Sequence, residues 1–395
     1  MKEGVSVKSN WEELLHLIPM QKEDSIDWDK LEHLFISYFD KMKETMQNPV
    51  WHGEGDVFTH TKMVCESLLQ DSRYYQLEKQ KKQIVFLATL LHDIGKIPCT
   101  KWDIDHWASP NHTVVGARMA RELLWKEYGV CGTKELQNMR ECICSLIRYH
   151  SVPSHLLEQS NPEQRLLKIA AQGEVIPDFS LELLQILVEA DMTGRISDTK
   201  KESLEMVTLC FELAKELDVF YQAGKFASNV TKRAYFLESN VWREQELYDT
   251  TWGEVILMSA LPGTGKDTWI REHYGNLPVV CLDDIRKELN ISPIEKQGVV
   301  IQEAKERAKQ YLRKKQPFIW NATNVTSKIR KPLLELFENY GASTKIVFLE
   351  TGWEEELRRN KGRIQEVPET AIIDMLKQLE VPERWEAREV EWNCI

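Results

Sequence analysis

Two short segments of this 395-residue chain combine residue types that act on phosphate groups. Residues 260–268 read Ala-Leu-Pro-Gly-Thr-Gly-Lys-Asp-Thr and follow a strand-like apolar run. Residues 90–96 read Leu-Leu-His-Asp-Ile-Gly-Lys. The glycine-rich segment indicates a loop that holds a nucleoside triphosphate, and the His-Asp pair indicates a metal-dependent phosphohydrolase centre. We therefore expect the chain to add phosphate at one site and to remove it at another.

The glycine-rich loop is expected to place its backbone N–H groups, and those of the helix that follows, against the phosphates. Lys266 would reach the outer two phosphates. Asp267 stands where Ser or Thr normally contacts Mg²⁺, so either Asp267 or the neighbouring Thr268 could supply that oxygen ligand. The residues predicted to bind the nucleotide are Pro262, Gly263, Thr264, Gly265, Lys266, Asp267 and Thr268.

Polar and charged residues follow the later predicted strands of the same region. Asp283, the first residue of an Asp-Asp pair, is predicted to be a general base, because a carboxylate at the carboxyl end of a parallel strand faces the substrate crevice. Such a pair is also typical of helix N-caps. Asn321 and Asn324 follow the third strand and are candidate substrate contacts. Arg359 and Arg363 follow the fourth strand and could neutralise charge at the γ-phosphate.

The first half of the chain carries residues that could hold divalent metal ions. Imidazole nitrogens and carboxylate oxygens bind such ions, and the bound cation makes a water molecule acidic enough to attack phosphorus near neutral pH. Lys96 and Arg195 could hold phosphate oxygens. Residues of these types follow one another in the order His60, His92, Asp93, His112, His150 and Asp191.

The elements that must position these residues change in kind along the chain. Apolar residues recur at helical spacing through the first half, and strand signals are nearly absent there. From about residue 252, short apolar runs alternate with amphipathic helices, which is typical of a parallel α/β sheet. Those predicted strands are 254–259, 279–282, 317–321 and 345–349. We therefore predict an all-α domain over residues 1–222, a connecting segment over 223–250 and an α/β domain over 251–395.

Composition limits the partners. The net charge of −11 argues against wrapping a nucleic-acid duplex, but it allows a local basic pocket for one strand end. Basic clusters at 328–331 and 358–363 could supply that pocket. The apolar runs are too short to span a bilayer, and no signal-peptide pattern begins the chain, so we expect a cytoplasmic protein with reduced cysteines.

The second half resembles the 5'-hydroxyl polynucleotide kinases of the P-loop phosphotransferase superfamily. The resemblance rests on the glycine-rich loop, on the Asp-Asp-x-Arg that includes Asp283, and on residues 359–387, which are similar to the lid and trailing segment of that family. It implies that Asp283 activates the 5'-hydroxyl and that Arg286 contacts the phosphate beside it. It also implies ATP with Mg²⁺ as the phosphate donor.

The succession of histidines and aspartates in residues 50–200 resembles the all-helical HD phosphohydrolase superfamily. The segment 51–61, Trp-His-Gly-Glu-Gly-Asp-Val-Phe-Thr-His-Thr, is most similar to HD modules attached to bacterial tRNA nucleotidyltransferases. The resemblance implies that His60, His92, Asp93 and Asp191 ligate one metal. It implies that His112 and His150 add a second, so one or two divalent transition metal ions are expected.

The order of the two regions resembles the bifunctional bacterial HD-Pnk end-healing enzymes. That resemblance implies an ATP-dependent 5'-hydroxyl kinase joined to a 2',3'-cyclic phosphodiesterase or 2'-phosphatase. Its partners would be RNA ends, or DNA ends, and it would act before an RNA ligase. Two alternatives stay open: a kinase and phosphohydrolase of a small metabolite such as a nucleotide, and a nucleotide-sensing regulator without turnover.

Overall fold

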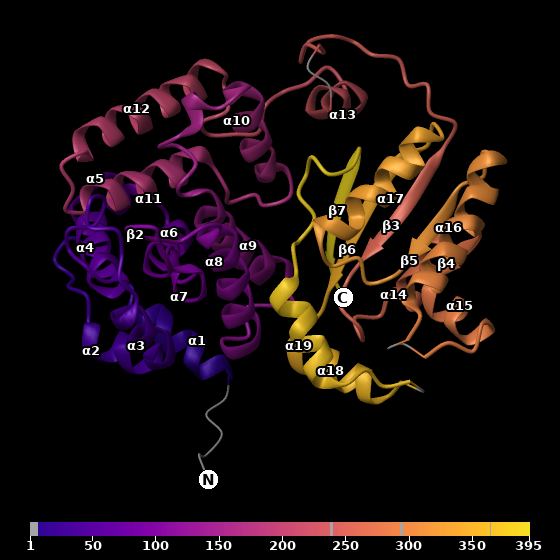
Figure 1. Cartoon of the computed structure of the whole chain (residues 1–395), viewed down its shortest axis with the longest axis horizontal. Coiled ribbons are helices and arrows are strands. Elements are labelled where there is room, and N and C mark those ends of the chain that lie inside the picture. The colour runs from indigo at the N-terminus through magenta and orange to yellow at the C-terminus, as the bar shows by residue number, and fades with distance from the viewer. Residues whose placement is uncertain (1–6, 238–239, 293–294, 364) are drawn as a thin grey trace. The chain divides into compact units, whose positions relative to one another are not determined.

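The computed structural model describes residues 7–237, 240–292, 295–363 and 365–395 (Figure 1). The chain separates into two compact units. One comprises residues 1–131 and 135–224, and the other comprises 132–134 and 225–395. The first is helical and the second is an α/β unit with a parallel sheet, which confirms the predicted fold class. No helix in these described ranges is both long enough and apolar enough to cross a membrane.

The first unit is built from helices with one small hairpin between them. A π-helical stretch at Leu123–Glu127 and 3₁₀ turns at Leu156–Glu158 and Ala171–Glu174 interrupt the regular helices. The α-helices are α1 (Val7–His16), α2 (Trp28–Leu34), α3 (Ile36–Glu44), α4 (Val57–Gln70), α5 (Ser72–Gln76), α6 (Lys79–Leu91), α7 (Lys96–Cys99), α8 (His112–Glu122), α9 (Lys134–Tyr149), α10 (Pro162–Ala170), α11 (Leu181–Thr193) and α12 (Lys200–Glu216).

Helix α6 lies at the centre of this unit. From Gln83 to Leu91 every residue is buried, so the helix is surrounded on all sides rather than along one stripe. It packs against α4 and α11, and α11 is almost as deeply buried. The sequence explains this, because Ile-Val-Phe-Leu-Ala-Thr-Leu-Leu offers no polar face. The carboxyl end of this central helix delivers the His-Asp pair into the interior.

The helical unit also contains strands that the sequence did not predict. Strands β1 (Lys101–Asp103) and β2 (His106–Ala108) form an antiparallel hairpin between α7 and α8. Each strand has only three residues and neither is fully buried, so no apolar run marks them. The hairpin is thus an unpredicted addition to a domain that is otherwise helical, as expected.

The second unit is a five-stranded sheet with helices on both faces. All neighbouring strands are parallel, in the order β4-β5-β3-β6-β7. The strands are β3 (Glu254–Ser259), β4 (Val279–Cys281), β5 (Phe318–Asn321), β6 (Ser343–Glu350) and β7 (Glu389–Cys394). The helices are α13 (Asn229–Leu237), α14 (Lys266–Tyr274), α15 (Leu282–Glu288), α16 (Gln297–Arg313), α17 (Ser327–Asn339), α18 (Trp353–Lys361) and α19 (Glu369–Gln378).

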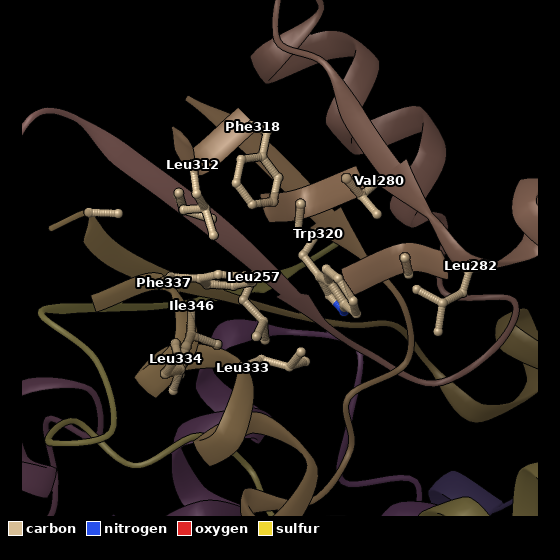
Figure 2. Close-up of a cluster of buried hydrophobic side chains, with 14 of the residues drawn as sticks. Leu257, Val280, Leu282, Leu312, Phe318, Trp320, Leu333, Leu334, Phe337 and Ile346 are labelled. Carbon is tan, nitrogen blue, oxygen red and sulfur yellow. The ribbon is translucent and has the colours of Figure 1, made fainter. Parts of the chain in front are cut away.

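Alternate residues of the central strand β3 face two separate cores. Val255 and Leu257 join Phe318, Trp320 and residues of α15, α16 and α17 in one cluster (Figure 2). Ile256 and Met258 pack on the opposite face, against α14. Because both faces are covered, the strand reads as a continuous apolar run rather than an alternating one.

The predicted strands of this unit correspond closely to the observed ones, with two corrections. Residue Leu282, expected to end the second strand, instead begins α15. Strand β7 (Glu389–Cys394) was not predicted; it pairs with β6 at the edge of the sheet, where half-exposed residues weaken the apolar signal.

Candidate active sites

Six predicted metal ligands converge inside the helical unit. They come from five places in the chain: α4, the end of α6, the start of α8, the end of α9 and the last turns of α11. The side chains of His60 and His92 are fully buried, and those of Asp93, His150 and Asp191 are 2 to 4% exposed. His112 has the largest exposed fraction of the six, at 19%. The side chains therefore form one cluster that opens to solvent on the His112 side.

The two oxygens of Asp93 face two different sets of imidazoles. Oδ2 lies 3.2 Å from Nε2 of His92 and 3.7 Å from Nε2 of His60. Oδ1 lies 3.5 Å from Nε2 of His112 and 3.8 Å from Nε2 of His150. Asp191 joins the first set, since its Oδ1 lies 3.1 Å from Nε2 of His60. This arrangement can serve either one metal or two metals bridged by Asp93.

The histidines are held in the tautomer that metal binding needs. Nδ1 of His92, His112 and His150 each contacts a backbone carbonyl oxygen at 2.8 to 2.9 Å. In a neutral ring, an Nδ1–H that donates to a carbonyl leaves Nε2 deprotonated, with its lone pair directed into the cluster. Burial lowers the pKa of His150 to about 3, so this ring stays neutral at physiological pH.

Four residues behind the cluster complete its support, and only one of them was predicted. Nδ1 of His60 lies 2.7 Å from Glu54 Oε1, which is also 3.0 Å from Nδ1 of His52. The predicted Lys96 donates to Gln47 at 2.6 Å and pairs with Asp93 at 2.7 Å. Glu54 and His52 stand in the segment 51–61, but the sequence alone gave them no role. The carboxylate-imidazole contact at Glu54 is the usual support for a metal-binding histidine.

Two cations keep the carboxylates of the cluster ionised. Burial works to raise the pKa of Asp93, but Lys96 and His92 hold that pKa well below its usual range. Burial is opposed in the same way at Asp191, where Arg195 and His60 hold the pKa well below its usual range. Nη2 of Arg195 lies 2.7 Å from Oδ1 of Asp191. Lys96 and Arg195 therefore contact the cluster directly.

A close approach of two backbones brings His112 to this cluster. A Cβ added at Gly95 would lie 2.0 Å from the His112 carbonyl oxygen and 2.4 Å from the amide nitrogen of Gly116. Gly95 and Gly116 therefore allow the start of α7 to touch α8. Any side chain at Gly95 would push α8 away and separate His112 from Asp93.

The residues of the cluster fit divalent metal ions. Nε2 of His92 and Oδ1 of Asp93 are buried and have no hydrogen-bond partner among the described residues. Buried polar atoms without partners are costly, and a cation would satisfy both. His60, His92 and Asp191, and separately His92, Asp93 and His150, each bring three ligand atoms within 4.8 Å of one another. Nitrogen and oxygen donors of this kind suit transition metals.

The glycine-rich loop of the second unit has the shape of a phosphate-binding loop. It connects β3 to α14, and Gly263 and Gly265 have φ angles of 88° and 106°, in the left-handed region. Lys266 donates its Nζ to the carbonyl of Leu261 at 3.1 Å. Thr264 also donates to this carbonyl, at 2.9 Å. The loop is thus closed on itself by its own side chains.

The side chains of Asp267 and Thr268 contact different residues. Oδ1 of Asp267 accepts a hydrogen bond of 2.7 Å from Asn321 at the end of β5. Thr268 is exposed, and its hydroxyl lies 3.4 Å from Arg271 on the same helix. Asn324 is buried, and its amide donates to the Met258 carbonyl of β3. Asp267 and Asn321 therefore meet at the strand ends, whereas Asn324 fixes the strands to each other.

The candidate base Asp283 lies between two arginines. Its Oδ1 pairs with Arg286 at 2.5 Å and its Oδ2 lies 3.4 Å from Arg363. Arg359 donates to the carbonyl of Thr264 in the phosphate-binding loop at 2.8 Å. The structure thus brings Arg359 to the loop and Arg363 to Asp283, although both are far from them in sequence.

Helix α18 also contributes a residue that the sequence did not single out. Glu356 is fully buried, and neither of its carboxylate oxygens has a hydrogen-bond partner among the described residues. Its carbonyl oxygen lies 2.7 Å from where a Cβ of Gly263 would be, so α18 packs directly on the loop. Burial raises the pKa of Glu356 to about 8. No local sequence pattern marks Glu356, because its surroundings include a loop that is distant in sequence.

One proposed basic cluster is not a surface pocket. Arg330 is fully buried and makes hydrogen bonds of 2.6 and 2.8 Å to Glu386. It also donates to the carbonyl oxygens of Asn324 and Glu380. The expectation that Arg330 helps to bind a strand end was therefore wrong, because its guanidinium is used to tie α17 to the chain around residue 386.

Comparison with known families agrees with this division. Residues 57–171 match the HD domain model, and residues 255–382 match an AAA domain model, AAA_33. These matches support a fusion of a segment similar to HD domains with a segment similar to P-loop kinases. Together with the buried His/Asp cluster, these domains fit an enzyme that handles nucleotides or other phosphate compounds.

Proposed function

We propose that the protein heals broken RNA ends. The P-loop unit transfers the γ-phosphate of ATP to a 5'-hydroxyl, and the HD unit opens a 2',3'-cyclic phosphate or removes a terminal 2'-phosphate. The observation that supports the proposal is the presence on one chain of two candidate phosphate sites, one built around Lys266 and Asp283 and the other around Asp93. Both products are the ends that a ligase joins, so the protein would act before an RNA ligase.

The kinase proposal gives each residue of the P-loop unit a task. Lys266 exchanges its loop carbonyl for the outer phosphates of ATP, and Arg359, already at the loop, neutralises charge on the group in transfer. Asp283 accepts the proton of the attacking 5'-hydroxyl, while Arg286 contacts the neighbouring phosphate of the strand. The P–O bond to ADP breaks as the bond to the 5'-oxygen forms. Asp267, held by Asn321, is the better placed ligand for Mg²⁺.

The hydrolase proposal assigns the metal to the cluster around Asp93. Bound divalent ions would supply Lewis-acid activation of water and of the phosphoryl group. Glu54 and the backbone carbonyls orient the imidazoles toward that position. Lys96 and Arg195 hold the carboxylates ionised and offer N–H donors to phosphate oxygens. Water adds to phosphorus, and the bond between phosphorus and one ribose oxygen breaks. That oxygen takes the proton from water and becomes a hydroxyl, so the cyclic phosphate becomes a monoester.

Small-metabolite phosphotransfer and nucleotide sensing are the competing functions, and one assay separates them. Radiolabelled ATP is incubated with a 5'-hydroxyl oligoribonucleotide, and a parallel sample carries a 2',3'-cyclic end with added Mn²⁺, Ni²⁺, Co²⁺ or Zn²⁺. End healing predicts a labelled 5' end in the first and ring opening in the second. A metabolite enzyme would label only nucleotides, and a sensor would bind ATP without turnover. Absence of end labelling would contradict the proposal. A deoxyribose oligonucleotide in the same assay tests RNA against DNA.

A further inference from the structure

The hairpin β1–β2 stands between two segments that hold residues of the HD cluster. It follows α7, which begins with Lys96, and precedes α8, which begins with His112. Its two ends are tied together by a 2.8 Å hydrogen bond between the hydroxyls of Thr100 and Ser109. The Ser109 carbonyl lies 2.9 Å from Nδ1 of His112. The base of the hairpin is therefore fixed to a candidate metal ligand.

One face of this hairpin is aromatic and exposed. Trp102 and Trp107 are direct cross-strand partners, so their side chains project from the same face. Their rings lie 5.1 Å apart at 83°. The side of Trp102 that Trp107 does not cover leaves this residue 58% exposed. A large aromatic surface left in water is typical of a binding site.

The turn of the hairpin carries a second unfavourable feature. Ile104 is 91% exposed and has a φ angle of 53°, a left-handed conformation that β-branched residues rarely adopt. Backbone strain of this kind is concentrated at ligand-binding segments. The exposed Trp102 and the strained, exposed Ile104 thus lie two residues apart, in a segment that contributes little to the buried core.

The opening of the metal cluster lies on the side of this hairpin. His112 is the most exposed of the six candidate ligands, and its ring contacts the base of the hairpin. Since an extended chain advances roughly 3.3 Å per residue, Trp102 stands about 7 Å beyond Thr100. The two tryptophans are therefore carried by strands whose shared base contacts His112.

We propose that the Trp102–Trp107 face stacks the terminal nucleobase of the strand whose 3'-terminal phosphate enters the HD cluster. The proposal rests on the proposed hydrolase function and adds a base-binding subsite to it. Stacking on aromatic rings accepts every base, which suits an enzyme that must treat breaks at any sequence. The exposed Lys101, next to Trp102 in β1, provides positive charge for the backbone of the strand.

The test compares two oligoribonucleotides that end in a 2',3'-cyclic phosphate, one with a normal terminal base and one with an abasic terminal nucleotide. The full-length protein and its Trp102→Ala and Trp102→Phe variants are assayed on both. Trp102→Ala should lower kcat/KM on the normal end by on the order of 10- to 100-fold and leave the abasic end unchanged. Trp102→Phe should restore most of the loss. Trp51→Ala is the matched control, because Trp51 is also exposed in this unit, at 44%, and should show no base-dependent loss.

Other outcomes overturn the proposal. Equal losses of kcat/KM on both substrates would show that Trp102 serves the folding of the domain. No loss on either substrate would show that the base binds elsewhere. A change of elution volume in size-exclusion chromatography for Trp102→Ala, without base-dependent loss, would assign the face to a second copy of the chain. Binding is read separately, without turnover, from the fluorescence of a 3'-terminal 2-aminopurine in the absence of metal. If wild-type protein binds this base through Trp102 but opens neither cyclic end, the hydrolase function fails while the subsite stands.

Discussion

Replacing the buried Glu356 by glutamine should change how the stability of helix α18 depends on pH. The carboxyl group has its pKa raised from 4.5 to about 8, chiefly by burial, with Glu350 adding to the rise and Lys266 and Arg359 opposing it. Below pH 4.5 both the folded and the unfolded chain hold the proton, so the ionisation of Glu356 does not affect the free energy of unfolding. Between pH 4.5 and 8 only the folded chain retains it, and the folded state loses stability as the pH rises.

The size of the effect follows from the shift. A difference of 8 − 4.5 = 3.5 pKa units corresponds to about 5 kcal/mol at pH values well above 8. Between pH 5 and pH 9 the cost of Glu356 should therefore grow by about 4 kcal/mol. Glutamine does not titrate, so whatever its buried amide costs is constant with pH. The free energy of opening in Glu356→Gln minus that of the wild type should therefore rise across this range.

Hydrogen exchange measured by mass spectrometry on peptides of α18 (Trp353–Lys361) gives this opening free energy in the full chain. The spectra are collected from pH 5 to 9 and corrected for intrinsic exchange rates. Glu354→Gln is the control, because Glu354 is exposed on the same helix. If Glu356→Gln and the wild type differ by a constant amount over the whole range, Glu356 does not titrate there and the reasoning from its burial is wrong.

Three further predictions test the two sites. Lys266→Ala and Asp283→Ala should each lower 5' phosphorylation by on the order of 100-fold or more without affecting hydrolysis, as measured with radiolabelled ATP; near wild-type labelling by Asp283→Ala would move the base to another residue. Asp93→Ala should eliminate opening of a 2',3'-cyclic end and leave the kinase intact, whereas His112→Ala should be severe only if two metals act; phosphate chemistry at the wild-type rate in Asp93→Ala would make the helical unit a scaffold. Glu54→Gln should weaken Mn²⁺ binding by about 10- to 100-fold in calorimetric titration, and unchanged affinity would reduce its contact with His60 to packing.

Much of the α/β unit could be predicted from the sequence because its signals are local. The strand Glu254–Ser259 was predicted with its observed bounds, since a strand covered on both faces is a continuous apolar run. The edge strand Glu389–Cys394 was missed, because Val390, Trp392 and Cys394 form only a short alternation with polar residues there. The hairpin at Lys101–Ala108 was missed for a similar reason, since its strands bury little.

The candidate sites likewise contain residues that were predicted from the sequence and residues that were not. The six His and Asp residues of the HD cluster were named from their order along the chain, and the structure brings them together. Glu54 was given no role, because its task depends on contacting His60 and His52 rather than on any spacing. Glu356 could not be found, since the loop on which it packs lies far away in sequence. Residues that act through tertiary contacts leave no local pattern.

The hydrogen bonds of Lys266 and Thr264 to the Leu261 carbonyl have a thermodynamic consequence for ligand recognition. These bonds hold the loop in shape, and a loop held in shape reduces the entropic cost of binding. Lys266, however, must give up a carbonyl partner before it can contact phosphate, and binding is an exchange of acceptors. Only an acceptor stronger than a peptide carbonyl gains from that exchange. The loop therefore favours ligands that carry anionic oxygen and disfavours neutral ligands of the same shape.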